Sequence, residues 1–180
     1  DLVTGVQTCA LPILKDKKAI VVGLGAMGSA CSLHLAKIGY RVFGIDAHTP
    51  ANSQGSSWGK TRLIRQAYFE DPSYIPLLKR SYELWRDLEQ ELETTLFHRT
   101  GLLVVTENDN KLTRGMQTNA RQHQIPLEIL SAQEIASIFP QFSVPDHFTG
   151  IWEEGAGYLE PENAVLAHLD SATRFGAEFN

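Results

Sequence analysis

Short apolar runs and one helical apolar pattern follow one another in the first part of the chain. Residues 19–22 are apolar without alternation, which is typical of a strand buried on both faces, and residues 41–45 predict a second strand. Between them, apolar residues recur from Ala26 at helical spacing, and Gly39 is suited to end the helix. The order strand, glycine turn, helix, strand predicts the opening of an α/β domain.

After residue 50 the pattern changes to helices and strands that do not continue this alternation. Residues 71–93 predict a long helix with one apolar face, with Asp71 as its cap and Pro72 at its first position. Ser131 and Glu134 have capping-box spacing and predict the start of a short helix. The other expected elements are strands at 100–106, 125–130, 148–154 and 155–159, helices at 111–122 and 161–174, and a strand beginning near 176.

Composition excludes several function classes. The chain has a net charge of -5 and no long basic run, so it offers no nucleic-acid surface. No apolar run has the length of a membrane span. Cys9 and Cys31 form neither a metal pattern nor a disulfide framework, which indicates a reducing compartment and a cytoplasmic location. The histidines stand singly, so no metal site is expected, and Cys31 is interpreted as a small packing residue.

Residues 1–13 do not fit the rest of the chain. They show no periodicity that leads into the first strand, and they lack the basic start and long apolar centre of a signal peptide. They resemble translated adapter sequence, so we expect a foreign, disordered tail.

The strongest motif is G-x-G-x-x-G, formed by Gly23, Gly25 and Gly28 directly after the first strand. Gly23 permits a tight turn, Gly25 leaves room for a pyrophosphate, and Gly28 allows the helix to lie close to the strand. The N-terminus of the helix favours phosphate groups. Asp46 ends the second strand, where it can accept hydrogen bonds from ribose hydroxyls and repel the 2′-phosphate of NADP. The pattern predicts dinucleotide binding, and the alternative is a glycine turn that only packs helix on strand.

The motif alone does not distinguish FAD from NAD. An NAD-dependent dehydrogenase would be favoured by continued strand–helix alternation, whereas here a polar loop over residues 47–60 leads to Arg62 and Arg65. A non-catalytic nucleotide-binding module is a third possibility.

Five stretches, in order, resemble the family of monomeric sarcosine oxidase, N-methyltryptophan oxidase and pipecolate oxidase, which are FAD-dependent amine oxidases of the D-amino-acid-oxidase superfamily. The stretches are VVGLGAMGSA, GIDAHTP, GSSWGKTRLIRQAYFEDPSYIPLLKRSYELWRDLE, FHRTGLLVV and GYLEPENAV. The resemblance implies an α/β fold, α+β overall, with a Rossmann-like FAD-binding domain and part of an inserted antiparallel-sheet substrate domain. We expect residues 14–70 and 155–180 in the incomplete FAD-binding domain, and residues 71–154, with the long helix, in the substrate domain.

The resemblance also implies functional residues. The implied FAD contacts are Gly23, Gly25, Ala26, Met27, Gly28, Asp46, Ala47, Ser56, Thr61 and Arg62. Arg62 would lie near the flavin ring, and Arg65 would meet the substrate carboxylate, so both are candidate catalytic residues. Arginine suits the latter role because it binds a carboxylate through two parallel hydrogen bonds and stays charged when desolvated.

Two alternatives remain at this arginine segment. In a helical turn Arg62 and Arg65 would share one face, whereas in a strand they would point to opposite faces. If the arginines hold an anion, Leu63 and Ile64 would anchor the segment in the core. Both arginines could also be surface charges without a ligand.

The resemblance implies oxidation of a secondary or N-methyl amino acid to an imine, with oxygen as acceptor and hydrogen peroxide as product. The family commonly has histidine, close to the flavin, at the position of Trp58, and tryptophan cannot transfer a proton. Because family members are much longer, we expect this chain to be an N-terminal part that is inactive alone and whose partner is the C-terminal half of the same enzyme.

Overall fold

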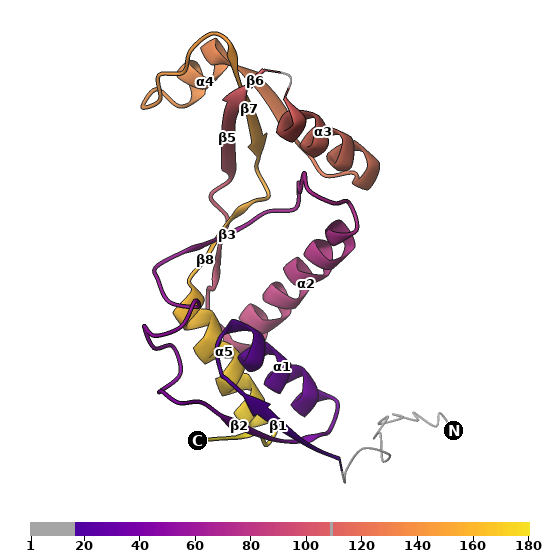
Figure 1. Ribbon diagram of the computed structural model, residues 1–180, viewed down its shortest axis with the longest axis vertical. Coiled ribbons are helices and arrows are strands. Elements are labelled where there is room, and N and C mark those ends of the chain that lie inside the picture. Colours follow the sequence, from indigo (N-terminus) through magenta and orange to yellow (C-terminus); the bar gives the residue numbers. More distant parts are fainter. Residues whose placement is uncertain (1–16, 109) are drawn as a thin grey trace, which may run out of the picture. The chain divides into compact units, whose positions relative to one another are not determined.

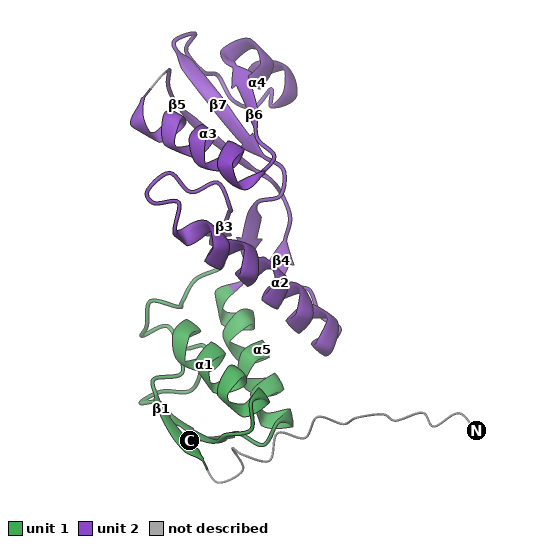
Figure 2. Ribbon diagram, turned by 90° about the vertical axis from the view of Figure 1, so that its right-hand side faces the viewer, with its two compact units in different colours: residues 1–60, 161–180 green, residues 61–160 purple. Residues whose placement is uncertain are grey.

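The computed structural model describes residues 17–108 and 110–180 (Figure 1). The expected tail at 1–13 lies outside these residues. The chain forms two compact units, and unit 2 is inserted in sequence between the two segments of unit 1 (Figure 2). Unit 1 runs to Lys60 and resumes at Pro161, and unit 2 is Thr61–Glu160. Residues 61–70 and 155–160, which we expected with the nucleotide-binding part, therefore lie in unit 2.

Unit 1 is a parallel sheet with two helices. The strand order is β1-β2-β9, and Gly44 of β2 pairs with both Val21 and Phe179. The two helices pack against each other, and Leu24, Val165 and Leu169 form a core together with Val21 and Phe179. The elements are β1 (Lys18–Val22), α1 (Ala26–Lys37), β2 (Arg41–Ile45), α5 (Pro161–Arg174) and β9 (Glu178–Phe179).

The sheet of unit 1 is covered on one face. Val21 faces the helices, whereas Ile20, Val22 and Phe43 are 70%, 79% and 41% exposed. The prediction that residues 19–22 form a strand buried on both faces is therefore wrong within the described residues, because both helices lie on the Val21 side. Cys31 is also exposed on α1 rather than packed in the core.

Unit 2 carries two antiparallel sheets, with strand orders β3-β8-β4 and β5-β7-β6. Together with the parallel unit 1, they confirm the predicted α/β architecture with an antiparallel-sheet insertion. The strands are β3 (Arg62–Ile64), β4 (Phe97–His98), β5 (Leu102–Glu107), β6 (Glu128–Ser131), β7 (Phe148–Glu153) and β8 (Gly157–Leu159). The helices are α2 (Tyr74–Leu92), α3 (Lys111–His123) and α4 (Ala132–Ile138).

A hydrophobic core in unit 2 links segments that are far apart in the sequence. Its buried members are Ala67, Ile75, Met116, Ala120, Ile125 and Ile151. Ala67 is fully buried and stands two residues after Arg65. The arginine segment is thus anchored directly in this core, which limits where the Arg65 side chain can lie.

Two helix starts differ in how well the sequence predicted them. The capping box before α4 is confirmed, because Ser131 Oγ accepts from the N–H of Glu134 and Glu134 Oε2 accepts from the N–H of Ser131. The start of α2 was predicted wrongly. Asp71 Oδ1 accepts from the N–H of Ser73 at 2.8 Å, which forms a turn before the helix, and the helix begins at Tyr74.

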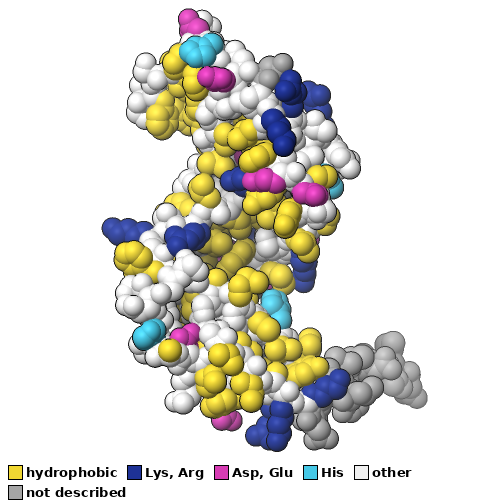
Figure 3. Space-filling model, in the orientation of Figure 1, with side chains coloured by type: hydrophobic (Ala, Val, Ile, Leu, Met, Phe, Trp, Pro, Cys, Tyr) yellow, Lys and Arg dark blue, Asp and Glu magenta, His cyan; other side chains and the backbone are white. Residues whose placement is uncertain are grey.

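Lys and Arg side chains lie at several places on the face seen in Figure 3, among hydrophobic and other residues. Within the described ranges no helix combines the length and the apolar content that a membrane crossing requires.

Candidate functional site

The glycine turn of unit 1 has the backbone geometry that the motif requires. Gly23 has a φ of +89°, a conformation that favours glycine. Its N–H donates to the carbonyl of Ile45 at 2.8 Å, which ties the turn to β2. A Cβ atom on Gly28 would overlap the carbonyl oxygen of Gly23, so α1 can approach the turn only because residue 28 has no side chain.

A pocket of about 310 Å³ opens at this turn, and it lies within unit 1. It brings together three of the predicted residues, Gly25, Asp46 and Ser56, which come from the turn, the end of β2 and the following loop. Its lining consists of Leu24, Gly25, Asp46, His48, Ala51, Asn52, Gln54, Gly55, Ser56, Ser57 and Val165.

Asp46 is held by the backbone on both sides of it. Its Oδ2 accepts from the N–H of Leu24, and its Oδ1 accepts from the N–H of His48 at 3.2 Å. The hydrogen bond from Leu24, which has the larger effect, and the one from His48 keep the pKa of the Asp46 carboxyl below its ordinary value. The pocket therefore presents an ionised carboxylate whose remaining lone pairs can accept from ligand hydroxyls.

Ser57 belongs to this site and was missed from the sequence. Its Oγ accepts from the N–H of Ala26 at 2.9 Å, at the first residue of α1. A Cβ atom on Gly25 would lie 3.1 Å from the same oxygen. The hydroxyl thus lies at the helix N-terminus, beside the N–H groups to which phosphate oxygens bind in dinucleotide sites. The serine pair before Trp58 was the signal in the sequence.

These features fit the adenosine diphosphate part of a dinucleotide. The helix N-terminus offers N–H donors to phosphate, and Asp46 offers an acceptor to ribose. Of the other implied contacts, Met27 is 86% exposed on the first turn of α1, and Ala47 follows Asp46. The loop that carries Ser57 is fixed by a bond from the N–H of Gly59 to Glu162 Oε1 of α5, at 3.2 Å.

Thr61, Arg62 and Arg65 belong to unit 2. Residues 62–64 form strand β3, so the strand alternative is the one found, and Arg62 pairs with Leu159 of β8. Ile64 is buried, but Leu63 is 64% exposed, so the expectation that both residues anchor the segment is wrong for Leu63. One side of a short antiparallel strand faces the interior, and Leu63 and Ile64 point to opposite sides.

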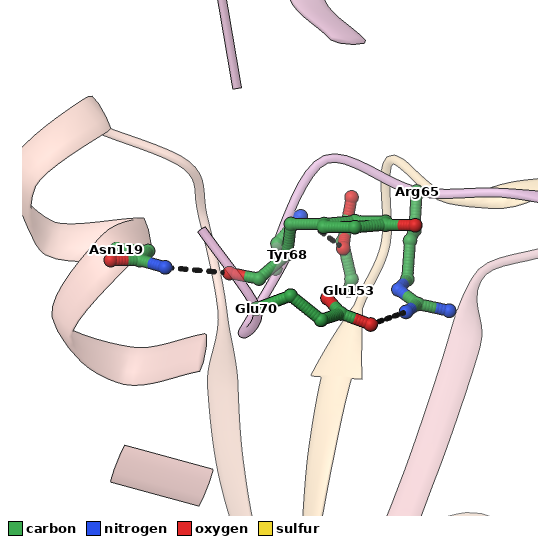
Figure 4. A network of polar contacts seen from close by, with 6 residues as sticks. Arg65, Tyr68, Glu70, Asn119 and Glu153 are labelled. Atoms are coloured by element: carbon green, nitrogen blue, oxygen red, sulfur yellow. Dashed lines mark hydrogen bonds and ion pairs between the residues drawn. The ribbon is translucent and has the colours of Figure 1, made fainter. Parts of the chain in front are cut away.

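Arg65 directly follows β3 and is partly buried, with 24% of its side chain exposed. Its guanidinium carbon lies 4.9 Å from the centre of the Tyr68 ring, and Nη2 lies 3.9 Å from Glu70 Oε1 (Figure 4). A separation of 3.9 Å is too long for a hydrogen bond, so the ion pair does not use the planar fork of donors. This guanidinium can therefore still bind a carboxylate through two hydrogen bonds.

Glu153, at the end of β7, was also missed from the sequence. It is 2% exposed, and its two oxygens accept hydrogen bonds from the backbone immediately after Arg65. Its neighbour Glu154 is exposed, and nothing in the local pattern distinguishes the two.

Comparison with known proteins identifies relatives over most of the chain. Residues 18–179 match the family DAO, described as FAD dependent oxidoreductase. Monomeric sarcosine oxidase of Streptomyces avermitilis is 42% identical over 161 residues, which is 89% of this chain and 42% of that protein. N-methyl-L-tryptophan oxidase of Yersinia pestis is 33% identical and is covered over 43% of its length, with 89% of this chain aligned.

Solved structures show the same architecture. NikD, an amino acid oxidase essential for nikkomycin biosynthesis, has a TM-score of 0.79 at 25% identity, with 91% of this chain and 43% of that chain covered. L-proline dehydrogenase from P. horikoshii has a TM-score of 0.76 at 25% identity, with 92% and 44% covered. The chain thus spans about two fifths of the length of the relatives it matches. The family match confirms the resemblance drawn from the five sequence stretches, and FAD with it: the chain belongs to the DAO family of FAD-dependent oxidoreductases.

Proposed function

We propose that this chain is the N-terminal part of an oxidase that converts a secondary or N-methyl amino acid to an imine. The observation that carries the proposal is Arg65, a partly buried guanidinium on the segment that matches the family's carboxylate-binding position. The named activities of the relatives, oxidation of sarcosine and of N-methyl-L-tryptophan, support a substrate that bears both an amine and a carboxylate.

Unit 1 would hold the dinucleotide. In this proposal the glycine turn, with Ala26 and Met27, binds the pyrophosphate, and Asp46 and Ala47 bind the ribose. Ser56 contributes from the loop, and Ser57 donates its hydroxyl to a phosphate oxygen. Thr61 and Arg62 are assigned to the cofactor from unit 2.

When bound, FAD supplies the two-electron oxidation of the substrate C–N bond, and oxygen takes up the electrons to give hydrogen peroxide. Arg65 orients the substrate by its carboxylate, so that the amine end is presented to the cofactor. Arg62 supplies a fixed positive charge near the flavin ring. The family commonly has histidine at the position of Trp58, whose indole N–H can donate a hydrogen bond but cannot transfer a proton.

Oxygen as the acceptor is a separate part of the proposal. One of the similar solved structures is named a dehydrogenase, so the electron acceptor differs among proteins of this architecture. The sequence similarity to the two oxidases favours oxygen as the electron acceptor.

The alternative of an NAD-dependent dehydrogenase does not agree with the match to an FAD-dependent family. The cytoplasmic location stays a prediction.

We also propose that activity requires the rest of the enzyme, because the chain covers 42% of the sarcosine oxidase it resembles. The partner in this sense is the C-terminal part of the same enzyme, and the chain alone would be inactive. Activity is therefore measured on the full-length enzyme that contains the chain.

The visible spectrum of the purified full-length enzyme tests the proposal. We expect the yellow absorbance of bound flavin, its loss when an N-methyl amino acid is added without oxygen, and peroxide formation when oxygen is admitted. A colourless protein would contradict the proposal. If the substrate bleaches the flavin but no peroxide forms when oxygen is admitted, the proposal of amine oxidation stands and oxygen is excluded as the electron acceptor.

A further inference from the structure

We propose that Glu153 is a positioning residue for Arg65, which sets how tightly the enzyme binds the carboxylate of its substrate. The inference rests on the proposed function and adds a residue that does not itself touch the substrate. It is carried by the hydrogen bonds, the burial and the charge of Glu153.

Glu153 clamps the backbone that follows Arg65. Its Oε1 accepts from the N–H of Gln66 at 2.7 Å, and its Oε2 accepts from the N–H of Ala67 at 3.0 Å. Both carboxylate oxygens are thus directed at two consecutive N–H groups. Because Arg65 comes immediately before them, a shift of this clamp moves the Cα atom from which the guanidinium extends.

The clamp acts where the sheet no longer holds the chain. Strand β3 ends at Ile64, so Arg65 is the first residue beyond the pairing with β8. Beyond the clamp, the carbonyl of Tyr68 accepts from Asn119 Nδ2 at 2.9 Å (Figure 4). Arg65 therefore lies between a strand end and a segment fixed by side chains from β7 and α3.

An electrostatic attraction links Glu153 to Arg65 as well. Burial is the largest influence and raises the pKa of the Glu153 carboxyl above its ordinary value, and the backbone hydrogen bonds from Gln66 and Ala67 and the positive charge of Arg65 offset part of this rise. Glu70 and Tyr68 contact the guanidinium from the same segment that Glu153 fixes.

A neutral side chain could not replace this carboxylate. Glutamine has one acceptor oxygen, so its amide nitrogen would face the second backbone N–H and leave it unsatisfied. Aspartate keeps both oxygens and the charge but is shorter by one methylene. Glu153→Gln therefore tests the need for two acceptor oxygens, and Glu153→Asp tests the need for the full length of the side chain.

The test compares Glu153→Gln with Glu154→Gln in the full-length enzyme. Glu154 is an exposed neighbour whose contact is an ion pair with Arg99 at 3.6 Å, and it serves as the matched control. For an N-methyl amino acid we expect Glu153→Gln to raise KM roughly ten- to a hundredfold, because a small displacement of a binding group has effects of this size. The change in kcat of Glu153→Gln should be smaller, and its flavin content should equal that of wild type. Glu154→Gln should match wild type in KM, kcat and flavin content.

A secondary amine without a carboxylate distinguishes positioning from general damage. Glu153→Gln should leave its kinetics within about twofold of wild type, because that substrate does not use Arg65. Equal losses on both substrates would overturn the proposal, as would an unchanged KM for the amino acid. Glu153→Asp should also raise KM at normal flavin content. If neither variant folds, Glu153 is a structural residue and the positioning role is wrong.

A measurement without turnover separates this inference from the proposed function. In NMR spectra of the full-length enzyme, Glu153→Gln should shift the backbone amide signals of Gln66 and Ala67 and the Nε–H signal of Arg65, and Glu154→Gln should not. If the full-length enzyme holds no flavin but these signals move, the function fails and the structural coupling stands. If the Arg65 signal stays in place, the coupling is wrong whatever the enzyme does.

Discussion

The glycine turn of unit 1 and the arginine segment of unit 2 are both suited to anions, but they are built differently. In unit 1 the donors are backbone N–H groups, and Leu24 and Asp46, which bond to each other, are 22 residues apart. In unit 2 the donor is one side chain, and the bonds that fix its segment join residues 86 and 87 positions apart. The first site depends on backbone conformation, and the second depends on tertiary contacts.

The difference predicts how each site tolerates change. A backbone site fails when a side chain intrudes into the space of the ligand, whereas substitutions other than proline leave its N–H donors in place. A side-chain site fails when the side chain is removed or its support moves. The following predictions run from the largest expected effect to the smallest.

Removal of the Arg65 side chain should have the largest effect. In the full-length enzyme, Arg65→Ala should lower kcat/KM for an N-methyl amino acid by roughly 30- to 4,000-fold, which corresponds to about 2–5 kcal/mol. The reason is that a carboxylate would lose its bidentate partner in a partly desolvated site. Steady-state kinetics with flavin content as reference provide the measurement.

Two controls sharpen the Arg65 prediction. Arg65→Lys should recover only part of the activity, since an ammonium lacks the planar fork. An amine without a carboxylate should be affected little by Arg65→Ala. Loss of flavin together with the arginine would instead make Arg65 a cofactor or structural residue.

A side chain at Gly28 should damage unit 1 even without a ligand. Gly28→Ala places a Cβ atom on the Gly23 carbonyl, so we expect a loss of about 1–3 kcal/mol or more in the free energy of unfolding. Gly55→Ala is the matched control, because a Cβ there meets no atom within 4 Å. Denaturant unfolding followed by circular dichroism measures both, and equal stability of the two variants would contradict the close approach of α1.

Substitution of Asp46 should weaken the binding of FAD moderately. Asp46→Ala removes an acceptor for the ribose and for the N–H of Leu24, so we expect FAD to bind roughly tenfold more weakly. Asp46→Asn keeps one acceptor oxygen, so its affinity for FAD should lie between those of wild type and Asp46→Ala. Retention of flavin during dialysis compares the three proteins, and identical retention would place the ribose elsewhere.

The capping box before α4 should have the smallest effect and a defined pH dependence. Ser131→Ala should lower the free energy of unfolding by about 1 kcal/mol, as for a typical N-cap. Hydrogen bonds from the backbone and side chain of Ser131 keep the pKa of Glu134 below its ordinary value of 4.5 in the folded state. Their contribution is thus present above pH 4.5 and is lost as pH falls through the lower folded-state pKa.

Thermal unfolding of wild type and Ser131→Ala at neutral and acidic pH checks this sign. The difference between the two proteins should shrink in acid, where protonated Glu134 no longer favours the box. A difference that grows in acid would mean that Glu134 is not held by Ser131.

The sequence predicted the parts of the fold that depend on neighbours along the chain. The glycine turn, the capping box at Ser131, helix α5 at 161–174 and the strand near the end of the chain follow from local backbone preferences and periodicity. Asp71 shows the limit, because its carboxylate binds the N–H of Ser73 and delays the helix that Pro72 was expected to begin. Pro72 favours a helix start and Asp71 favours a turn before the helix, and the sequence alone does not show which preference is the stronger.

The sequence by itself determined the glycine turn and the position of Arg65 in the chain, because the conformational freedom of glycine and the charge of arginine are properties of single residues. The exposed face of β1, the exposure of Leu63, the place of Ser57 at the helix N-terminus and the clamp by Glu153 were decided only by the tertiary structure. Glu153 and Glu154 are identical residues side by side, and one is buried against backbone N–H groups while the other is exposed. Burial and hydrogen bonding depend on segments brought together by folding, so no local pattern distinguishes the two.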